Sequence, residues 1–264
     1  MFALLNRGWR LIFTGLSFSL FGIGSLVLGG IIFSIIHVIY PKLKAERLCR
    51  YGVCLAFRAF IGFMHYTGVL RFELTNEKTL PEPGQLIIAN HPSLIDVIFI
   101  IAQVPDAFCV VKESAWRNPF MKFIMLTTGY IQNSSPESFI DDCATVLKRG
   151  DTLVMFPEGT RTKPNKPLKF RKGAARIALA AGKSITPVHI YLDPTTLTKG
   201  EPWFHLPKNR ICFYMCVGDL IEPQSVVSLE DDHQKQVKTL TQYFVNYFGA
   251  INNEFINANT FSRN

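Results

Sequence analysis

The chain has 264 residues, of which 48% are hydrophobic and only 18% are charged, with 22 phenylalanines among them. This length allows one domain with an appendage, and the composition is globular with a tendency toward membranes. The formal net charge of +8 indicates an acidic partner. Nucleic acid is excluded as that partner, because the lysines and arginines are dispersed and no nucleic-acid-binding motif is present.

The six cysteines point to packing and not to a metal or a redox centre. They form no C-x-x-C pair and no Cys/His cluster with zinc spacing. Cys212 and Cys216 alternate with Tyr214, as on one face of a strand. We therefore expect no metal site and a reduced domain that faces the cytosol.

Residues 1–42 are predicted to anchor the chain in a membrane. Between Leu11 and Tyr40 there is no Asp, Glu, Lys or Arg, and as a helix this stretch would be about 45 Å long, against about 30 Å of hydrocarbon. It suits a tilted span or a bent, membrane-embedded segment. A signal peptide is disfavoured, because its apolar region would be shorter and a small-residue cleavage site should follow. Gly29 and Gly30 are compatible with three structures: a straight membrane helix with ordinary glycine packing, a kinked helix, or a hairpin.

The positive charges around this segment predict its orientation. Arg7 and Arg10 precede it, and a larger group of basic residues follows it between Lys42 and Arg50. Positive charge accumulates on the cytoplasmic side of a membrane segment. We therefore expect the rest of the chain on the cytoplasmic face of the inner membrane.

Residues 43–68 are predicted to form an amphipathic linking helix, with arginines set among leucines and phenylalanines. Such a helix can lie in the membrane interface, or it can cover a core and turn a basic face outward. The residues at 229–264 are expected to form a C-terminal surface helix that ends in a polar tail.

Between these helices, residues 69–228 are predicted to form an α/β domain with a largely parallel central sheet flanked by helices. Short apolar runs alternate here with helical stretches, which is typical of βαβ units. The expected strands are Arg71–Leu74, Leu86–Ala89, Phe108–Val111, Thr152–Phe156, Ile185–Tyr191 and Arg210–Val217. The expected helices are Asn118–Thr127, Pro136–Lys148 and Gly173–Ala181.

A first motif, Asn90-His91-Pro92-Ser93-Leu94-Ile95-Asp96, follows one of these strands. His91 is expected at the carboxyl end of the strand, where open α/β sheets bind ligands. Pro92 suits the first turn of a helix, which would place Asp96 just over one turn further on. A carboxylate there can hold one imidazole nitrogen and leave the other free to accept a proton. For this spacing alone, the alternative is a histidine that caps a helix.

A second motif, Phe156-Pro157-Glu158-Gly159-Thr160-Arg161, opens a loop after another buried strand. This loop is expected at the same edge of the sheet as the first motif. Arg161 can bind a phosphate bidentately, and Gly159 lets the backbone approach a ligand closely. Glu158 can orient a hydroxyl group or pair with Arg161. A tight turn with a surface ion pair is the alternative.

The order and spelling of the two motifs resemble the glycerolipid acyltransferase family, whose best-known member acylates lysophosphatidate. The resemblance runs from about Leu70 to Val217. It implies a membrane-bound O-acyltransferase of phospholipid biosynthesis that moves a fatty acyl group to the hydroxyl of a lysophospholipid. The donor would be acyl-CoA or acyl carrier protein, and both are acidic, as are the lipid headgroups of a membrane.

The resemblance also implies roles for single residues. His91 would be the general base and Asp96 the carboxylate that orients it. The acceptor and its phosphate would be bound by Glu158, Gly159, Thr160 and Arg161. In the family a Phe-basic-x-Gly segment begins a helix that helps to hold this phosphate, and Arg171 occupies the basic position here. A solvated charge cluster is the alternative for Arg171.

One position departs from the family. An arginine commonly follows the strand before the middle helix, but this chain reads Gly129-Tyr130-Ile131-Gln132-Asn133. The loss of one phosphate ligand leaves two acceptors open. The acceptor is lysophosphatidate held by Arg161 and Arg171, or it is a specialised lipid, such as a polyene-type product loaded from carrier protein.

A third reading belongs to another class: a membrane lipid hydrolase or a non-catalytic lipid-binding protein. Hydrolysis needs a nucleophile or a metal, and Ser93 lacks the Gly-x-Ser-x-Gly elbow of a serine nucleophile. No metal or organic cofactor is implied, because alcoholysis of a thioester needs only a base and positioning.

Overall fold

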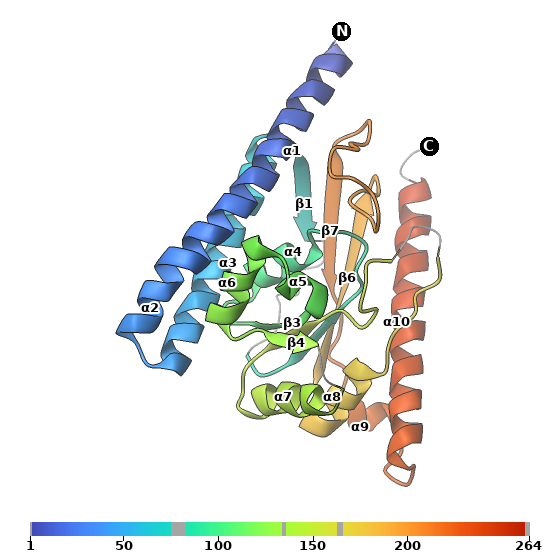
Figure 1. The fold of residues 1–264 in the computed structure, drawn as a ribbon. Coiled ribbons are helices and arrows are strands. Elements are labelled where there is room, and N and C mark those ends of the chain that lie inside the picture. The colour runs from blue at the N-terminus through green and yellow to red at the C-terminus, as the bar shows by residue number, and fades with distance from the viewer. Residues whose placement is uncertain (1, 75–82, 134–135, 163–165, 262–264) are drawn as a thin grey trace.

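A twisted sheet runs through the computed structural model, which describes residues 2–74, 83–133, 136–162 and 166–261 (Figure 1). In this described part the sheet has seven strands in the order β1-β7-β6-β2-β5-β3-β4. The strands are β1 (Leu70–Leu74), β2 (Leu86–Ala89), β3 (Phe108–Lys112), β4 (Ile131–Asn133), β5 (Leu153–Met155), β6 (Ile185–Asp193) and β7 (Ile211–Val217). Each expected strand is present within two residues of its expected bounds at either end, and the short β4 is added to them.

The sheet is largely parallel, as the sequence predicts. Strands β6, β2, β5, β3 and β4 run in one direction. Strands β1 and β7 pair parallel with each other, and β7 joins the larger group antiparallel to β6. The carboxyl ends of β2 and β5 therefore lie side by side at one edge, which brings the loops that follow them together.

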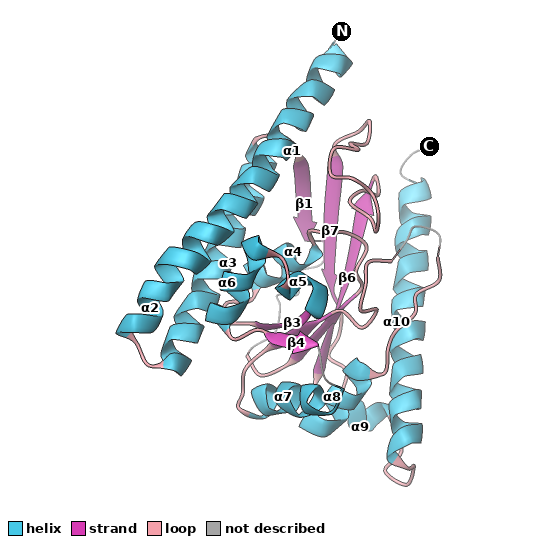
Figure 2. Ribbon diagram, in the orientation of Figure 1, coloured by secondary structure: helices cyan, strands magenta, loops and turns pink. Residues whose placement is uncertain are grey.

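Helices cover both faces of the sheet (Figure 2). The longer helices are α1 (Phe2–Val27), α2 (Phe33–Ile39), α3 (Lys42–Tyr66), α4 (Asp96–Gln103), α6 (Pro119–Thr128), α7 (Pro136–Lys148), α8 (Gly173–Ala181) and α10 (His233–Phe261). Two four-residue helices, α5 (Glu113–Trp116) and α9 (Pro223–Val226), complete the set in the described residues.

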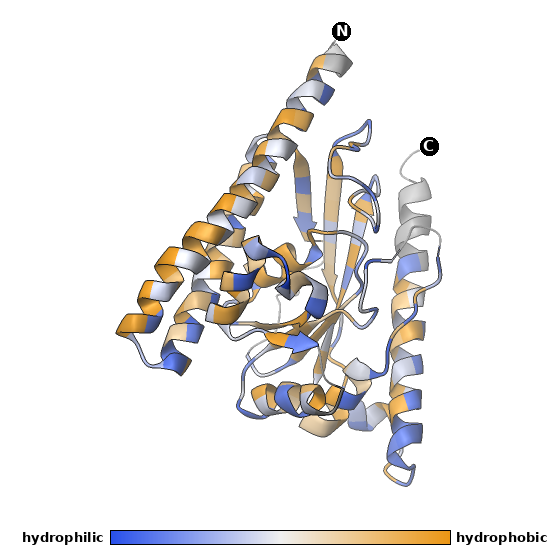
Figure 3. Cartoon of the chain, viewed as in Figure 1, coloured by the Kyte–Doolittle hydropathy of each residue, from blue (hydrophilic) through white to orange (hydrophobic). Residues whose placement is uncertain are grey.

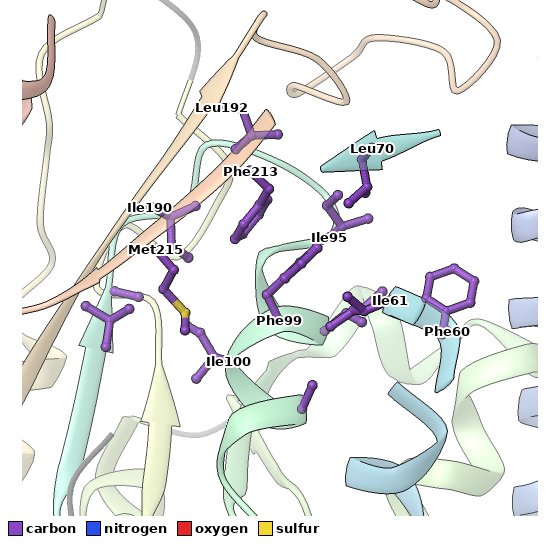
Figure 4. Close-up of a cluster of buried hydrophobic side chains, with 14 of the residues drawn as sticks. Phe60, Ile61, Leu70, Ile95, Phe99, Ile100, Ile190, Leu192, Phe213 and Met215 are labelled. Atoms are coloured by element: carbon purple, nitrogen blue, oxygen red, sulfur yellow. The ribbon is translucent and has the colours of Figure 1, made fainter. Parts of the chain in front are cut away.

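Alternation along the strands divides the core into two layers. In β2, Ile87 and Ala89 face α3 and α4, whereas Leu86 and Ile88 face α7, α8 and α10, because successive strand residues point to opposite faces. Figure 4 shows the first layer, where Phe99 of α4 stacks on Phe213 of β7 with ring centroids 3.8 Å apart. These packed layers fix α4, the helix that begins beside the sheet edge.

The N-terminal helix is mostly apolar after its first turns (Figure 3). Within the described residues, Leu5–Ile39 is the one helix long and apolar enough to cross a membrane, with a mean hydropathy of 2.2 over an 18-residue window. A hairpin at Gly29-Gly30 is not what forms there. A π-helical segment, Leu28–Ile32, joins α1 to α2, and the chain reverses only at Tyr40-Pro41, before α3.

Helix α3 matches the predicted linking helix, but its arginines do not all form a basic outer face. Arg50 is only 3% exposed. It donates to Asp106 Oδ1 at 2.7 Å and to the carbonyl of Thr128 at 2.9 Å, while Arg58 donates to the carbonyl of Ala102. Both cations therefore face neighbouring elements of the domain, because each has polar partners there.

Candidate active site

The loop between β2 and α4 carries the first motif and is tied to β6. The side chain of Asn90 donates to the carbonyl of Ile190 at 2.8 Å and accepts from the N–H of Ile190 at 2.7 Å. This paired contact continues the β2–β6 ladder by one position beyond Ala89. Asn90 thus fixes the point at which the chain leaves the sheet, directly before His91.

His91 and Asp96 meet as the sequence predicts. His91 Nδ1 lies 2.7 Å from Asp96 Oδ2, and Asp96 is fully buried. Because a carboxylate only accepts, the proton of a neutral imidazole lies on Nδ1, and Nε2 is the nitrogen left to accept another. The side chain of His91 is 20% exposed, so the histidine is partly open to solvent while its orienting carboxylate is not.

Helix α4 begins later than Pro92 would suggest. Residues before Asp96 form a bend, and Asp96 itself is the first residue of the helix. The bend brings Ser93 onto the same carboxylate, with its N–H donating to Asp96 Oδ2 at 2.7 Å and its hydroxyl donating to Asp96 Oδ1. The expected spacing of just over one helical turn is therefore wrong, although the contact that it predicts is present.

Ser93 is a site residue whose role sequence reasoning missed. Its hydroxyl is buried and committed to Asp96, which suits a group that orients the carboxylate. The signal available was its place three residues before Asp96, since serine often bonds locally to a nearby group in a turn.

The second motif follows β5 and contacts the first motif directly. Glu158 Oε1 accepts the main-chain N–H of His91 at 2.7 Å, and the N–H of Thr162 donates to the carbonyl of His91 at 2.9 Å. The ring of Phe156 stacks on the imidazole with centroids 4.3 Å apart. One loop thus holds both the main chain and the ring of the candidate base.

Glu158 is a buried carboxylate with 7% of its surface exposed. Burial raises the pKa of Glu158 to about 7, although the hydrogen bond from His91 and the charge of His91 act in the opposite direction. Its described contacts do not include Arg161, so the ion pair that the sequence left open is not present among the described residues.

The two arginines of the predicted phosphate site occupy different places. Arg161 Nη1 donates to the carbonyls of Leu197 and Thr198, at 2.9 and 3.1 Å. The guanidinium of Arg171 lies over the turn at Gly159, where φ is +66° and an added Cβ would stand 3.0 Å from Arg171 Nε. The positive φ favours glycine there, and an added Cβ would also require the Arg171 side chain to shift by a few tenths of an ångström.

Thr160 lies in the same turn, between Gly159 and Arg161. Glu158 thus contacts His91 directly, and Arg171 lies at Gly159 of the same turn. Arg161 directs one nitrogen toward the loop between β6 and β7.

A lysine lies beside Asn133, in the segment where this chain departs from the family. Asn133 ends β4 and is in register with Lys112, which ends β3. Strand β3 is also paired with β5, the strand before Glu158. An exposed cation therefore lies at the sheet edge beside the position where the family commonly has an arginine, and its place at the end of an apolar run was the signal in the sequence.

Residues 71–191 match the protein-family model described as Acyltransferase. The chain is 28% identical over 141 residues to a 1-acyl-sn-glycerol-3-phosphate acyltransferase of Borreliella burgdorferi, covering 51% of this chain and 56% of that protein. It is 34% identical over 128 residues to the enzyme of the same name from Helicobacter pylori, covering 46% of this chain and 53% of that protein. The matched regions thus span about half the length of these relatives.

The fold resembles the crystal structure of the 1-acyl-sn-glycerophosphate (LPA) acyltransferase, PlsC, from Thermotoga maritima. The TM-score is 0.66 at 19% identity, and the match covers 93% of this chain and 98% of that one. At this identity the likeness establishes the fold alone. The family match covers residues 71–191, the region that holds both motifs, and the chain is similar there to the acyltransferase family.

Proposed function

We propose that the protein is a membrane-bound O-acyltransferase that moves a fatty acyl group from acyl-CoA or acyl carrier protein to the hydroxyl of a lysophospholipid such as lysophosphatidate. The observation that carries the proposal is the contact between His91 and buried Asp96, 2.7 Å long, in an acyltransferase-family domain. Relatives named as 1-acyl-sn-glycerol-3-phosphate acyltransferases support this choice of acceptor.

In the proposed reaction His91 Nε2 takes the proton of the acceptor hydroxyl as its oxygen attacks the thioester carbonyl. The tetrahedral intermediate then collapses, the carbon–sulfur bond breaks, and the imidazolium returns the proton to the leaving thiolate. Asp96 keeps the ring in the required tautomer and stabilises the imidazolium. The products are an ester and a free thiol, and the scheme uses no metal or organic cofactor.

Several cations are available for a phosphate on the acceptor. Arg171 lies at Gly159, and a guanidinium retains donors beyond the two bonds that Arg161 makes to carbonyls. Lys112 takes the edge position beside Asn133. We propose that Arg171 and Lys112, with Arg161, hold the acceptor's phosphate in place of the family's arginine, where this chain has the amides Gln132 and Asn133.

The first test is acyl transfer to lysophosphatidate by detergent-solubilised protein, with acyl-CoA and with acyl carrier protein as donors. We expect product from the wild type, and His91→Ala to lose activity by at least about 1000-fold. His205→Ala removes an exposed histidine that pairs with Glu201 and should keep full activity. Near-normal turnover by His91→Ala would contradict the assignment of the base.

A specialised lipid acceptor remains the second candidate, and the amides at Gln132 and Asn133 favour it. In that case the folded protein would use acyl carrier protein and ignore lysophosphatidate. Efficient turnover of lysophosphatidate would exclude this candidate.

We further propose that Leu5–Ile39 lies in the membrane interface of the inner membrane's cytoplasmic face and does not cross the bilayer. Trp9 Nε1 donates to the carbonyl of Thr67, and His37 Nε2 lies 2.8 Å from the carbonyl of Thr127. The helix between them, about 42 Å long, is longer than the hydrocarbon layer of about 30 Å. If it spanned the bilayer, the domain elements attached to it along this length would enter hydrocarbon.

A further inference from the structure

Glu158 faces the main chain of the candidate base. Its Oε1 accepts the N–H of His91 at 2.7 Å, and its surface is 7% exposed. The nearest cation of its own motif, Arg161, donates elsewhere, to the carbonyls of Leu197 and Thr198. The orientation of this carboxylate is therefore set by the histidine it holds.

The rest of the loop holds the same residue. The N–H of Thr162 donates to the carbonyl of His91 at 2.9 Å, and Phe156 stacks on the imidazole. The two peptide groups that flank the His91 side chain are thus both fixed by the loop after β5. Since a displacement of about 1 Å at a reacting group can cost a large part of the rate, these contacts bear on catalysis without touching substrate.

We propose that Glu158 is a positioning residue: its carboxylate holds the main-chain N–H of His91 and thereby sets where the imidazole meets the acceptor hydroxyl, and it does not bind the acceptor itself. This inference rests on the proposed acyl transfer for its kinetic consequences, although the contact stands without it.

The groups around Glu158 decide which of its protonation states holds His91 best. His91, in the loop after β2, and Asp96, at the start of α4, lie close enough to act on its charge, and Arg171 lies at the neighbouring Gly159. An ionised carboxylate accepts an N–H more strongly than a neutral one. Because burial raises the pKa of Glu158 to about 7, this carboxylate becomes ionised, and holds the His91 N–H more strongly, as pH rises through neutrality.

The kinetic test compares Glu158→Gln and Glu158→Ala with the wild type, while the acceptor is varied. Gln keeps an oxygen that can accept the His91 N–H, and Ala does not. We expect kcat to fall roughly 10-fold in Gln and at least 100-fold in Ala, with the KM for the acceptor within about threefold in both. The exposed Glu230→Ala serves as the matched control and should leave both constants unchanged. A rise in acceptor KM of tenfold or more with kcat retained would overturn the proposal.

The pH profile gives a readout that loss of structure alone would not produce. As pH falls below about 7, kcat/KM of the wild type should fall more steeply than that of Glu158→Gln, because only the wild type takes up a proton at position 158. Identical acid limbs in the two proteins would count against the proposal.

Hydrogen–deuterium exchange at the His91 amide separates this inference from the proposed function, because it needs no activity. The amide should exchange at least about tenfold faster in Glu158→Ala than in the wild type, and Glu158→Gln should restore most of the protection. Unchanged exchange in Glu158→Ala would overturn the positioning role. If the wild type transferred no acyl group while the exchange result held, the proposed function alone would fail.

Discussion

The carboxylate of Asp96 accepts hydrogen bonds from three donors at the candidate site. Asp96 accepts from the imidazole and from both the N–H and the hydroxyl of Ser93, and it begins α4. A helix N-terminus favours negative charge, so the start of α4 is a suitable place for a carboxylate that accepts these hydrogen bonds. In the proposed reaction, the orientation of His91 Nε2 thus depends on a residue that is fully buried.

Asp96→Asn should lower kcat by roughly 100- to 10,000-fold, because an amide can present its NH₂ to Nδ1 and select the wrong tautomer. The fold should persist, since Asn has the same size and can still accept from Ser93. Steady-state acyl transfer measured beside a far-ultraviolet circular dichroism spectrum tests this. A kcat within tenfold of the wild type would show that the carboxylate's charge is unimportant.

The buried carboxylate of Glu158 also predicts how stability changes with pH. The pKa of Glu158 is raised from 4.5 to about 7 in the folded protein. The stability associated with its protonated form is therefore fully present below pH 4.5 and is lost as pH rises to about 7, by about 3 kcal/mol at most. Glu158→Gln removes this loss. Its Tm should exceed that of the wild type at pH 8 and approach it at pH 5, whereas an equal difference at both values would refute the assignment.

At the scale of elements, the contact between the N-terminal helix and α6 explains a buried glycine. An added Cβ at Gly29 would stand 2.7 Å from the backbone nitrogen of Ile124 and 2.9 Å from the carbonyl carbon of Phe123. The π-helical segment that includes Gly29 thus lies against the backbone of α6. Close packing, and not a change of chain direction, is what this glycine permits.

Gly29→Ala should destabilise the protein by about 1–3 kcal/mol, because it overpacks the contact with α6. Gly24→Ala is the matched control, since nothing lies within 4 Å of its added Cβ and alanine is the better helix former by about 1 kcal/mol. Thermal unfolding in detergent should therefore show Tm shifts of opposite sign. Equal shifts for the two variants would rule out the packing explanation.

Across the whole molecule, the loop between β6 and β7 connects the site to the apolar N-terminal helix. Its residues Leu197 and Thr198 accept from Arg161. Further along the same loop, the buried Arg10 donates to three successive carbonyls, those of Pro207, Lys208 and Asn209. Trp203 packs on the helix at Gly15 and Phe18, and it and Phe204 remain 40% and 59% exposed.

If the N-terminal helix lies in the interface, Trp203 should contact lipid with it, since aromatic side chains favour that depth. With Trp9 and Trp116 changed to Phe, the fluorescence of Trp203 should be quenched by brominated acyl chains in anionic vesicles. A protein whose single tryptophan comes from Leu229→Trp, which lies beyond the opposite end of β6, is the control and should be quenched far less. Equal quenching at the two positions would argue against the proposed placement.

The sequence by itself determined every described strand except the short β4, together with the middle helices and the sheet edge that carries the candidate site. A buried parallel strand is a short run of apolar residues, so it can be recognised from one segment of sequence alone, as in Leu86–Ala89 and Thr152–Phe156. The meeting of His91 with Asp96 was also predictable, because the two residues are only five positions apart.

Only the tertiary structure decided how the second motif acts on the first. Glu158 and His91 are 67 positions apart in the chain, and no local pattern states whether a carboxylate points at an arginine, at a ligand or at a backbone N–H. The same is true of Gly29, whose neighbour α6 comes from a distant part of the chain. The period of the apolar residues and the spacing of turn residues predict single helices and strands, because both patterns reflect backbone geometry within one segment. Contacts between segments depend on how the segments pack, and packing is fixed only when the whole core is formed.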